Sequence, residues 1–203
     1  MASYLADLIP GDIIPAKVTH LESFGAFVDI GCGLSSLLSV DSISVSRISH
    51  PRDRLRVGDP IFTVVKLIDR THRRIFVSMR ELLGTWEQNA ARFAPGQTVS
   101  GIVRSVESYG AFVELAPNLA GLAELREGSA DRDLAVVGNR VAVYIKSIIP
   151  DRMKIKLVLI DSCKEVSPPA PLTYYIDGST TSHIPYWRYS PICARKVIES
   201  VFE

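Results

Sequence analysis

The chain has 203 residues, of which 47% are hydrophobic, and 23 Lys and Arg nearly balance 22 Asp and Glu for a net charge of +1. This composition is typical of a globular protein, and it argues against a duplex-DNA binder, which would usually be far more basic. The sequence has no apolar run near the roughly 18 residues that span a bilayer, and its start lacks the basic-then-apolar pattern of a secretory signal, so we expect a cytoplasmic protein without membrane contact.

The first part of the chain predicts short strands separated by turns. Runs of β-branched and aromatic residues alternate with clusters of Gly, Ser, Pro and Asp, which is typical of strands and their connections. The expected strands are Asp12 to Leu21, Phe24 to Ile30, Leu34 to Leu38, Ile61 to Ile68 and Arg74 to Ser78. Five short antiparallel strands in a unit of this size favour a small closed barrel of the oligonucleotide/oligosaccharide-binding (OB) type.

A helix is predicted directly after these strands. Residues 78–81 have the sequence of a capping box, Ser-Met-Arg-Glu. Apolar residues then recur at three- and four-residue steps along one helical face: Met79, Leu82, Leu83, Trp86, Ala90 and Phe93. We therefore expect a helical linker over residues 80–94 in place of a flexible Gly/Ser linker.

The next part of the chain repeats the first. An ungapped alignment of Pro10 to Leu38 with Pro95 to Ala123 gives eleven identities in twenty-nine positions, counted along the sequence, where unrelated sequences would share about two. The matching strands are expected at Thr98 to Val106, Tyr109 to Leu115, Leu119 to Ala123, Arg140 to Ile149 and Met153 to Ile160. The sequence therefore predicts a second barrel of the same type.

The repeat ends after Asp161. Prolines 168, 169 and 171 mark a break, and Asp177-Gly178 then predicts the turn of a hairpin between Leu172 to Ile176 and Thr181 to Tyr189. Ser190-Pro191 is expected to begin a final helix. The aromatic residues of this tail favour packing over a face of the second repeat, with docking of a partner or RNA stacking by Tyr186, Trp187 or Tyr189 as open alternatives.

The predicted fold is mainly β, with two tandem five-stranded OB-fold barrels joined by a helix and followed by a C-terminal hairpin–helix extension. The predicted domains are a first barrel at 1–79, a helical linker at 80–94, a second and more divergent barrel at 95–161, and an extension at 162–203.

The repeated core places two aromatic residues three positions apart. Phe24 and Phe27 can share one face of a regular strand only if a bulge inserts one extra residue, and Gly25 would make such a bulge easy by accepting a positive φ. Two rings on one exposed face would form a platform for unstacked bases. The alternative is that both rings belong to the barrel core, which is the commoner place for an aromatic residue.

The sequence predicts no enzyme, no metal site and no cofactor. His20, His50 and His72 are scattered, and no Ser, His and Asp constellation or phosphate-cradling glycine loop is present. The three cysteines are odd in number and have no paired spacing, which argues against a disulfide framework or a zinc knuckle.

The first repeat resembles the S-one RNA-binding domain, which is named for ribosomal protein S-one of the bacterial small subunit. The resemblance covers residues 9–79 well and residues 94–160 more loosely. It is carried by Pro10-Gly11-Asp12, Phe24-Gly25-Ala26-Phe27-Val28, His50-Pro51, Val57-Gly58-Asp59, Leu67-Ile68-Asp69-Arg70 and Arg74-Ile75-Phe76-Val77-Ser78.

The resemblance implies an RNA-binding surface in the first repeat. It gives Phe24 and Phe27 the role of stacking rings, and Asp69 and Arg74 the role of the acidic and basic residues on the last two strands. Ser39 stands where the family has a histidine, so a hydroxyl that can bond a phosphate or base edge replaces a ring.

In the second repeat the resemblance implies a weaker surface. Tyr109, Phe112 and Lys154 occupy family positions, whereas Glu124 replaces the histidine and Ile149 replaces the aspartate. Because a carboxylate repels a phosphate chain, we expect this repeat to bind RNA poorly, or to serve as a spacer or protein-docking barrel.

Two hypotheses for function follow. The first is a non-catalytic single-stranded RNA-binding protein of bacterial type that resembles ribosomal protein S-one and acts in translation or RNA metabolism, with the ribosome or RNA-processing proteins as further partners. The second is a protein-interaction scaffold whose barrels have lost RNA binding.

Overall fold

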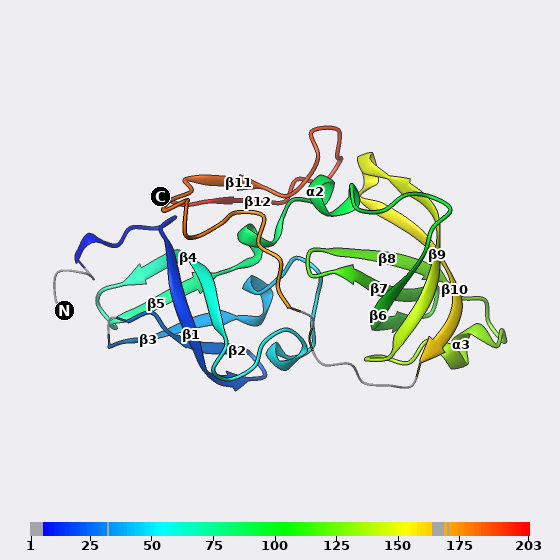
Figure 1. The fold of residues 1–203 in the computed structure, drawn as a ribbon, viewed down its shortest axis with the longest axis horizontal. Coiled ribbons are helices and arrows are strands. Elements are labelled where there is room, and N and C mark those ends of the chain that lie inside the picture. Colours follow the sequence, from blue (N-terminus) through cyan, green and yellow to red (C-terminus); the bar gives the residue numbers. More distant parts are fainter. Residues whose placement is uncertain (1–5, 32, 164–168, 170) are drawn as a thin grey trace. The chain divides into compact units, whose positions relative to one another are not determined.

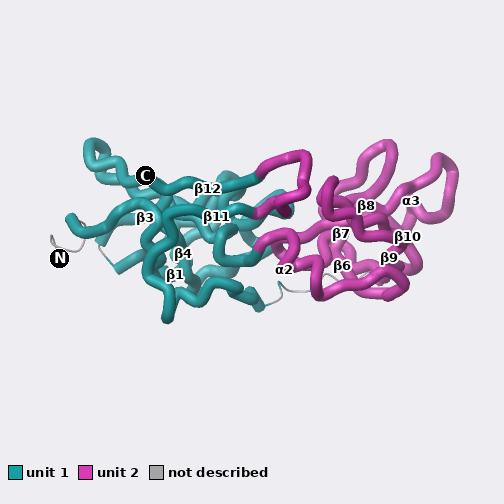
Figure 2. Tube along the Cα trace, turned by 90° about the horizontal axis from the view of Figure 1, so that it is seen from above, with its two compact units in different colours: residues 1–84, 169–188, 198–203 teal, residues 85–168, 189–197 magenta. Residues whose placement is uncertain are grey.

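The computed structural model describes residues 6–31, 33–163, 169 and 171–203. The chain forms two compact units, which Figure 2 shows in different colours. Unit 1 comprises residues 1–84, 169–188 and 198–203, and unit 2 comprises residues 85–168 and 189–197. The C-terminal tail therefore contributes residues to both units.

Unit 1 contains a closed five-stranded barrel, as predicted. Its strands are β1 (Ile13–Glu22), β2 (Gly25–Asp29), β3 (Ser35–Ser39), β4 (Pro60–Asp69) and β5 (Arg74–Ser78). They follow the order β1-β2-β3-β5-β4, in which β3 and β5 are parallel and the other neighbours are antiparallel (Figure 1). Short 3-10 helices, η1 (Val40–Ser42) and η2 (Pro51–Asp53), lie in the connection between β3 and β4.

Unit 2 contains a second closed barrel with the same strand order. Its strands are β6 (Thr98–Glu107), β7 (Gly110–Ala116), β8 (Leu119–Glu124), β9 (Arg140–Ile149) and β10 (Lys154–Cys163), with the short α3 (Asp131–Leu134) and η4 (Pro150–Arg152) in the connections. Here β8 and β10 form the parallel pair. The predicted fold class, mainly β with tandem OB-type barrels, is thus confirmed.

The barrel cores follow from the alternation of side chains along each strand. In β1, Ile14, Ala16 and Val18 are buried in the core of the barrel, while Lys17 and Thr19 between and after them are exposed. Burying a side chain of the size of Ile14 or Val18 stabilises the fold by about 1.5–3 kcal/mol. Because side chains alternate along a strand, the burial of these apolar residues determines which of their neighbours face water.

The predicted bulge between Phe24 and Phe27 is wrong. Phe24 lies in the two-residue turn that Glu22 and Gly25 close, so strand alternation does not constrain its side chain. The register shift is in β1, where Thr19 is the extra residue between two pairs. Gly25 does not have a positive φ. It is needed because a Cβ at this position would lie 2.4 Å from the carbonyl oxygen of Leu38 on β3.

The helical linker is shorter than the periodicity predicted. The 3-10 helix η3 (Arg80–Leu83) ends at Gly84, which has φ +95°, and a separate helix α2 (Trp86–Ala90) follows. The capping box is formed by Thr85 and Gln88, not by the predicted residues 78–81. A turn that only glycine accommodates easily thus divides the apolar stretch into two pieces.

The tail differs from the predicted hairpin and helix. It holds one antiparallel pair, β11 (Tyr186–Arg188) with β12 (Glu199–Val201), and residues 190–198 between them are not helical (Figure 1). The Asp177 turn forms, since Thr181 N–H donates to the Asp177 carbonyl at 2.9 Å, but it closes no hairpin. Pro168 of the predicted break lies outside the described residues.

The reason is that residues 182–184 of the tail bond to the first barrel instead of closing a hairpin across the Asp177 turn. The N–H of Ile13 donates to the Ser182 carbonyl at 2.8 Å, and the N–H of Ile184 donates to the Gly11 carbonyl at 2.9 Å. These bonds use the backbone groups that a local hairpin would need. Most of the described tail, residues 169–188 and 198–203, therefore belongs to unit 1. The predicted packing on the second repeat holds only for residues 189–197, where the Tyr189 hydroxyl donates to the Asn118 carbonyl.

None of the helices in the described ranges is long and apolar enough to cross a membrane.

Candidate nucleic-acid interface

A row of outward-facing side chains crosses the first barrel. Neighbouring strands pair His20 with Phe27, Phe27 with Leu37, Leu37 with Phe76, and Phe76 with Leu67. All five side chains are exposed or half-buried. We call this set the outer row, and it gives the barrel a continuous apolar and aromatic strip that water can reach.

Phe24 extends this strip at the β1–β2 turn. It is 54% exposed, and its ring meets that of Phe27 edge to face with 6.0 Å between centroids. On the other side of Phe27, the His20 ring lies 6.4 Å away at an interplanar angle of 31°. Three rings from β1, the turn and β2 therefore form one cluster. A solvent-facing cluster of this kind can stack unpaired bases, because every base has a π-face.

Ser39 lies next to this cluster. It pairs with Gly25 across β2 and β3, and its hydroxyl donates to Ser42 Oγ at 2.9 Å. The exposed Lys66 approaches the same Ser42 oxygen, with its Nζ at 3.5 Å. Lys66 is the extra residue at the register shift of β4 against β5. The bulge thus places the Lys66 ammonium near the Ser42 hydroxyl, which is bonded to Ser39 opposite Gly25.

Asp69 and Arg74 form a cross-strand pair where β4 meets β5. The pKa of Asp69 is lowered, chiefly because its carboxylate accepts the backbone N–H of His72, and further because it accepts a bond from the His72 ring. Asp69 and Arg74 line a shallow hollow of about 170 Å³ together with Arg70 and Arg73. Three guanidinium groups against one carboxylate make this end of the face favourable to phosphate.

The second barrel keeps the ring pair but not the outer row. Tyr109 is 57% exposed, and its ring meets that of Phe112 edge to face at 6.3 Å. The positions that correspond to the outer row are held by Ser105, Phe112, Leu122, Lys156 and Ser147. Polar residues thus replace His20, Phe76 and Leu67, and the apolar strip is interrupted.

A groove of about 640 Å³ lies on this face of the second barrel. Its wall includes Tyr109, Glu124, Lys146 and Lys156. Glu124 pairs with Gly110, so its carboxylate enters the face where Ser39 stands in the first barrel. The exposed Lys154 pairs with Ile149 and is not among the residues of the groove. The structure therefore brings Tyr109 and Glu124 together with two other lysines.

The first barrel matches a known protein family. Residues 7–80 match the model of the S1 RNA binding domain. The first barrel is an S1 RNA-binding domain. With the second barrel of the same strand order, the chain carries tandem S1-type domains.

Curated relatives agree with this assignment. Small ribosomal subunit protein bS1 of Leuconostoc lactis is 32% identical over 163 residues, which cover 77% of this chain and 38% of that protein. The bS1 protein of Staphylococcus haemolyticus is 33% identical over 190 residues, which cover 90% of this chain and 47% of that protein. The chain thus spans less than half the length of these relatives. Among solved structures, GSP13 from Bacillus subtilis is 24% identical over 45% of this chain and 63% of that chain, with a TM-score of 0.35.

Sequence reasoning missed several residues of the two S1-type faces. His20 was one of the scattered histidines, and only the β1–β2 register places it beside Phe27. The sequence did not assign Lys66 or Lys146 to an RNA-binding surface, although both lysines occupy the same position when β4 is aligned with β9. Each is the extra residue at a register shift against the following strand.

The aromatic residues of the tail contribute little to either S1-type face. Trp187 and Tyr189 are 6% and 5% exposed, so neither ring is open to a base. Tyr186 is 49% exposed, and its hydroxyl donates to Glu199 Oε2 at 2.7 Å.

Among the described residues, no group of three or more His, Cys, Asp or Glu could hold a metal ion.

Proposed function

We propose that this chain is a non-catalytic protein that binds single-stranded RNA through its first S1 domain and acts in translation or RNA metabolism. The observation that carries the proposal is the cluster of three solvent-accessible rings, Phe24, Phe27 and His20, on one face of that domain. The likeness to bS1 ribosomal proteins supports the translational setting and the ribosome as a partner.

The proposed mechanism is stacking assisted by charge. Bases leave their own stack and lie on Phe24 and Phe27, with His20 as a third ring, while Lys66 and Arg74 contact phosphates at the two ends of the face. Stacking contributes about 1–3 kcal/mol per base, so two rings give a gross energy comparable to a millimolar to tens-of-micromolar site. Since stacking accepts every base, we expect little sequence preference.

The second S1-type domain is proposed to be the weaker site. Tyr109 and Phe112 offer the same ring pair, but the carboxylate of Glu124 faces the groove. A weak second site still matters, because two linked sites on one strand gain affinity by effective concentration.

Fluorescence-anisotropy titration with a pyrimidine-rich RNA tests the proposal. The variant Phe24→Ala plus Phe27→Ala should abolish most binding and leave thermal stability nearly intact, because the side chain of Phe24 is more than half exposed and that of Phe27 is half-buried. The matched variant Tyr109→Ala plus Phe112→Ala in the second domain should lose less binding. Unchanged affinity in the first variant would reject the ring surface as the RNA site.

The second candidate is a protein-interaction scaffold with degenerate RNA-binding barrels. It is favoured by the interrupted outer row and by Glu124 in the second domain. A pull-down after thorough nuclease treatment separates the candidates. A scaffold keeps its partners after the treatment, whereas an RNA-bridged complex loses them.

A further inference from the structure

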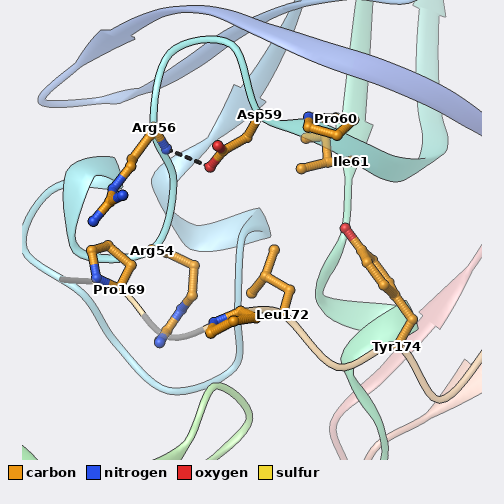
Figure 3. A pocket seen from close by; sticks show the side chains of 9 residues that line it. Arg54, Arg56, Asp59, Pro60, Ile61, Pro169, Leu172 and Tyr174 are labelled. Atoms are coloured by element: carbon orange, nitrogen blue, oxygen red, sulfur yellow. Dashed lines mark hydrogen bonds between the residues drawn. The ribbon is translucent and has the colours of Figure 1, made fainter.

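A pocket of about 260 Å³ lies at the start of β4, beside Pro60 and Ile61 (Figure 3). Asp69 is at the opposite end of that strand. The walls of the pocket come from the turn before β4 and from the tail residues that pack on unit 1. The volume is just below the roughly 300–1,000 Å³ of sites for drug-sized ligands. The pocket therefore suits a small ligand or one terminal group of a larger one.

Two arginines line one side of this pocket. The residue Arg54 is only 6% exposed, and its guanidinium donates to Ser44 Oγ at 3.2 Å. The hydroxyl of Ser44 in turn donates to the Ser46 carbonyl at 2.8 Å, so the partner of Arg54 is itself held in place. Arg56 is exposed on the same turn and completes a pair of guanidinium groups.

Asp59 is the only acidic residue among the described residues that line the pocket. Its carboxylate accepts the backbone N–H of Arg56 at 2.8 Å, the bond drawn in Figure 3. This bond closes the turn that carries Arg56. The carboxylate thus has a structural partner on the backbone. The described lining residues, with two arginines and one aspartate, carry a net positive charge of one.

The opposite wall is apolar and preformed. Leu172 and Tyr174 from the tail pack against the core of the first barrel. The Tyr174 ring meets Phe62 edge to face at 5.7 Å, and its hydroxyl accepts the Phe62 N–H at 3.2 Å. Figure 3 shows Leu172 and Tyr174 facing the turn that bears Asp59. A flat or apolar part of a ligand could rest on this wall while an anionic part reaches the arginines.

We propose that this pocket binds a phosphomonoester, namely the 5′-phosphate of a nucleotide, either at the end of an RNA strand or free. A phosphomonoester presents three oxygens, so the planar forks of Arg54 and Arg56 can both be satisfied at once. A phosphate inside an RNA chain has only two unlinked oxygens and needs two exits for the chain. The nucleoside of the bound group lies against Leu172 and Tyr174.

The first test uses the full chain and octauridylate labelled at its 3′ end, carrying either a 5′-phosphate or a 5′-hydroxyl. We expect the 5′-phosphate to tighten binding about tenfold, as charge-assisted bidentate bonds would. Arg56→Gln should remove this difference, and because Arg56 is exposed the variant should fold. Arg47→Gln is the matched control, since Arg47 is exposed in the same connection and does not line the pocket. Equal affinity of the wild-type chain for both RNAs would overturn the terminal-phosphate form of the proposal.

The second test needs no RNA and so separates this proposal from the proposed function. Uridine monophosphate should shift the NMR signals of the Tyr174 ring and the Leu172 methyl groups, and uridine should not. These shifts in a chain that fails to bind RNA would support the pocket and reject the ring surface. RNA binding without a 5′-phosphate preference and without these shifts would reject the pocket and leave the ring surface standing. If the chain binds uridine monophosphate as tightly as the 5′-phosphorylated RNA, a free nucleotide is sufficient to fill the pocket and the rest of the RNA adds no affinity.

Discussion

The carboxylate of Glu81 accepts a hydrogen bond from Ser200 Oγ at 2.8 Å, although 119 residues separate them in the chain. Glu81 is 2% exposed and also accepts the hydroxyl of Ser78 at 2.6 Å. Arg80 reaches the same pair, with its Nη2 donating to Ser200 Oγ at 3.2 Å. The end of the chain thus satisfies a buried acid directly after the first S1 domain.

Replacing Ser200 should therefore destabilise the first domain. Ser200→Ala leaves the buried Glu81 carboxylate with one hydroxyl partner fewer, which should cost about 1–3 kcal/mol of unfolding free energy. Urea unfolding of the full chain measures this. Thr173→Ala, at an exposed position of the same tail, is the control and should be within about 0.5 kcal/mol of wild type. Equal unfolding free energies of the two variants would show that the Ser200 hydroxyl does not stabilise the first domain.

Lys66 should contribute to RNA affinity through charge. Lys66→Met removes the cation near Ser42, so binding should weaken several-fold. The slope of log affinity against log salt should become shallower by about 0.7, the value for one phosphate contact on single-stranded RNA. Lys17→Met, which removes an exposed lysine of β1, is the matched control. A slope that Lys66→Met leaves unchanged would exclude a phosphate contact at this residue.

Glu124 should limit RNA binding by the second domain. Glu124→Ser places there the residue that the first domain has at the corresponding position, Ser39, and removes a carboxylate from the groove. In a background with Phe24→Ala and Phe27→Ala, the change should raise the remaining affinity about threefold to tenfold, as removal of like-charge repulsion would. An unchanged RNA affinity would mean that the missing outer row, and not the Glu124 carboxylate, limits RNA binding by this domain.

The pKa of Asp69 should give a defined acid response. Because the bonds from His72 lower the pKa in the folded chain, the stability from Asp69 is fully present above its ordinary value of 3.8. This contribution is lost as the pH falls through the lower folded value. An NMR titration of the Asp69 carboxyl carbon measures the midpoint directly. A midpoint at or above 3.8 would contradict the prediction.

The two barrels could be predicted from the amino-acid sequence alone. Alternating apolar residues and turn clusters are local signals, and the bounds of β5 and β9 agree with those predicted. The repeat and its spaced blocks also predicted the S1 domain and the exposed ring of Phe24, because the block lies within one short stretch of chain.

Contacts between residues that are distant in sequence could be identified only in the folded chain. His20 joins Phe27 through the register of β1 and β2, and Tyr174 and Ser200 reach the first domain across more than a hundred residues. The tail has the β-propensity and turn signal of a hairpin, yet its backbone groups bond to the start of β1. The local sequence indicates which polar groups need a hydrogen-bond partner. The folded chain determines which partner lies near enough to form the bond.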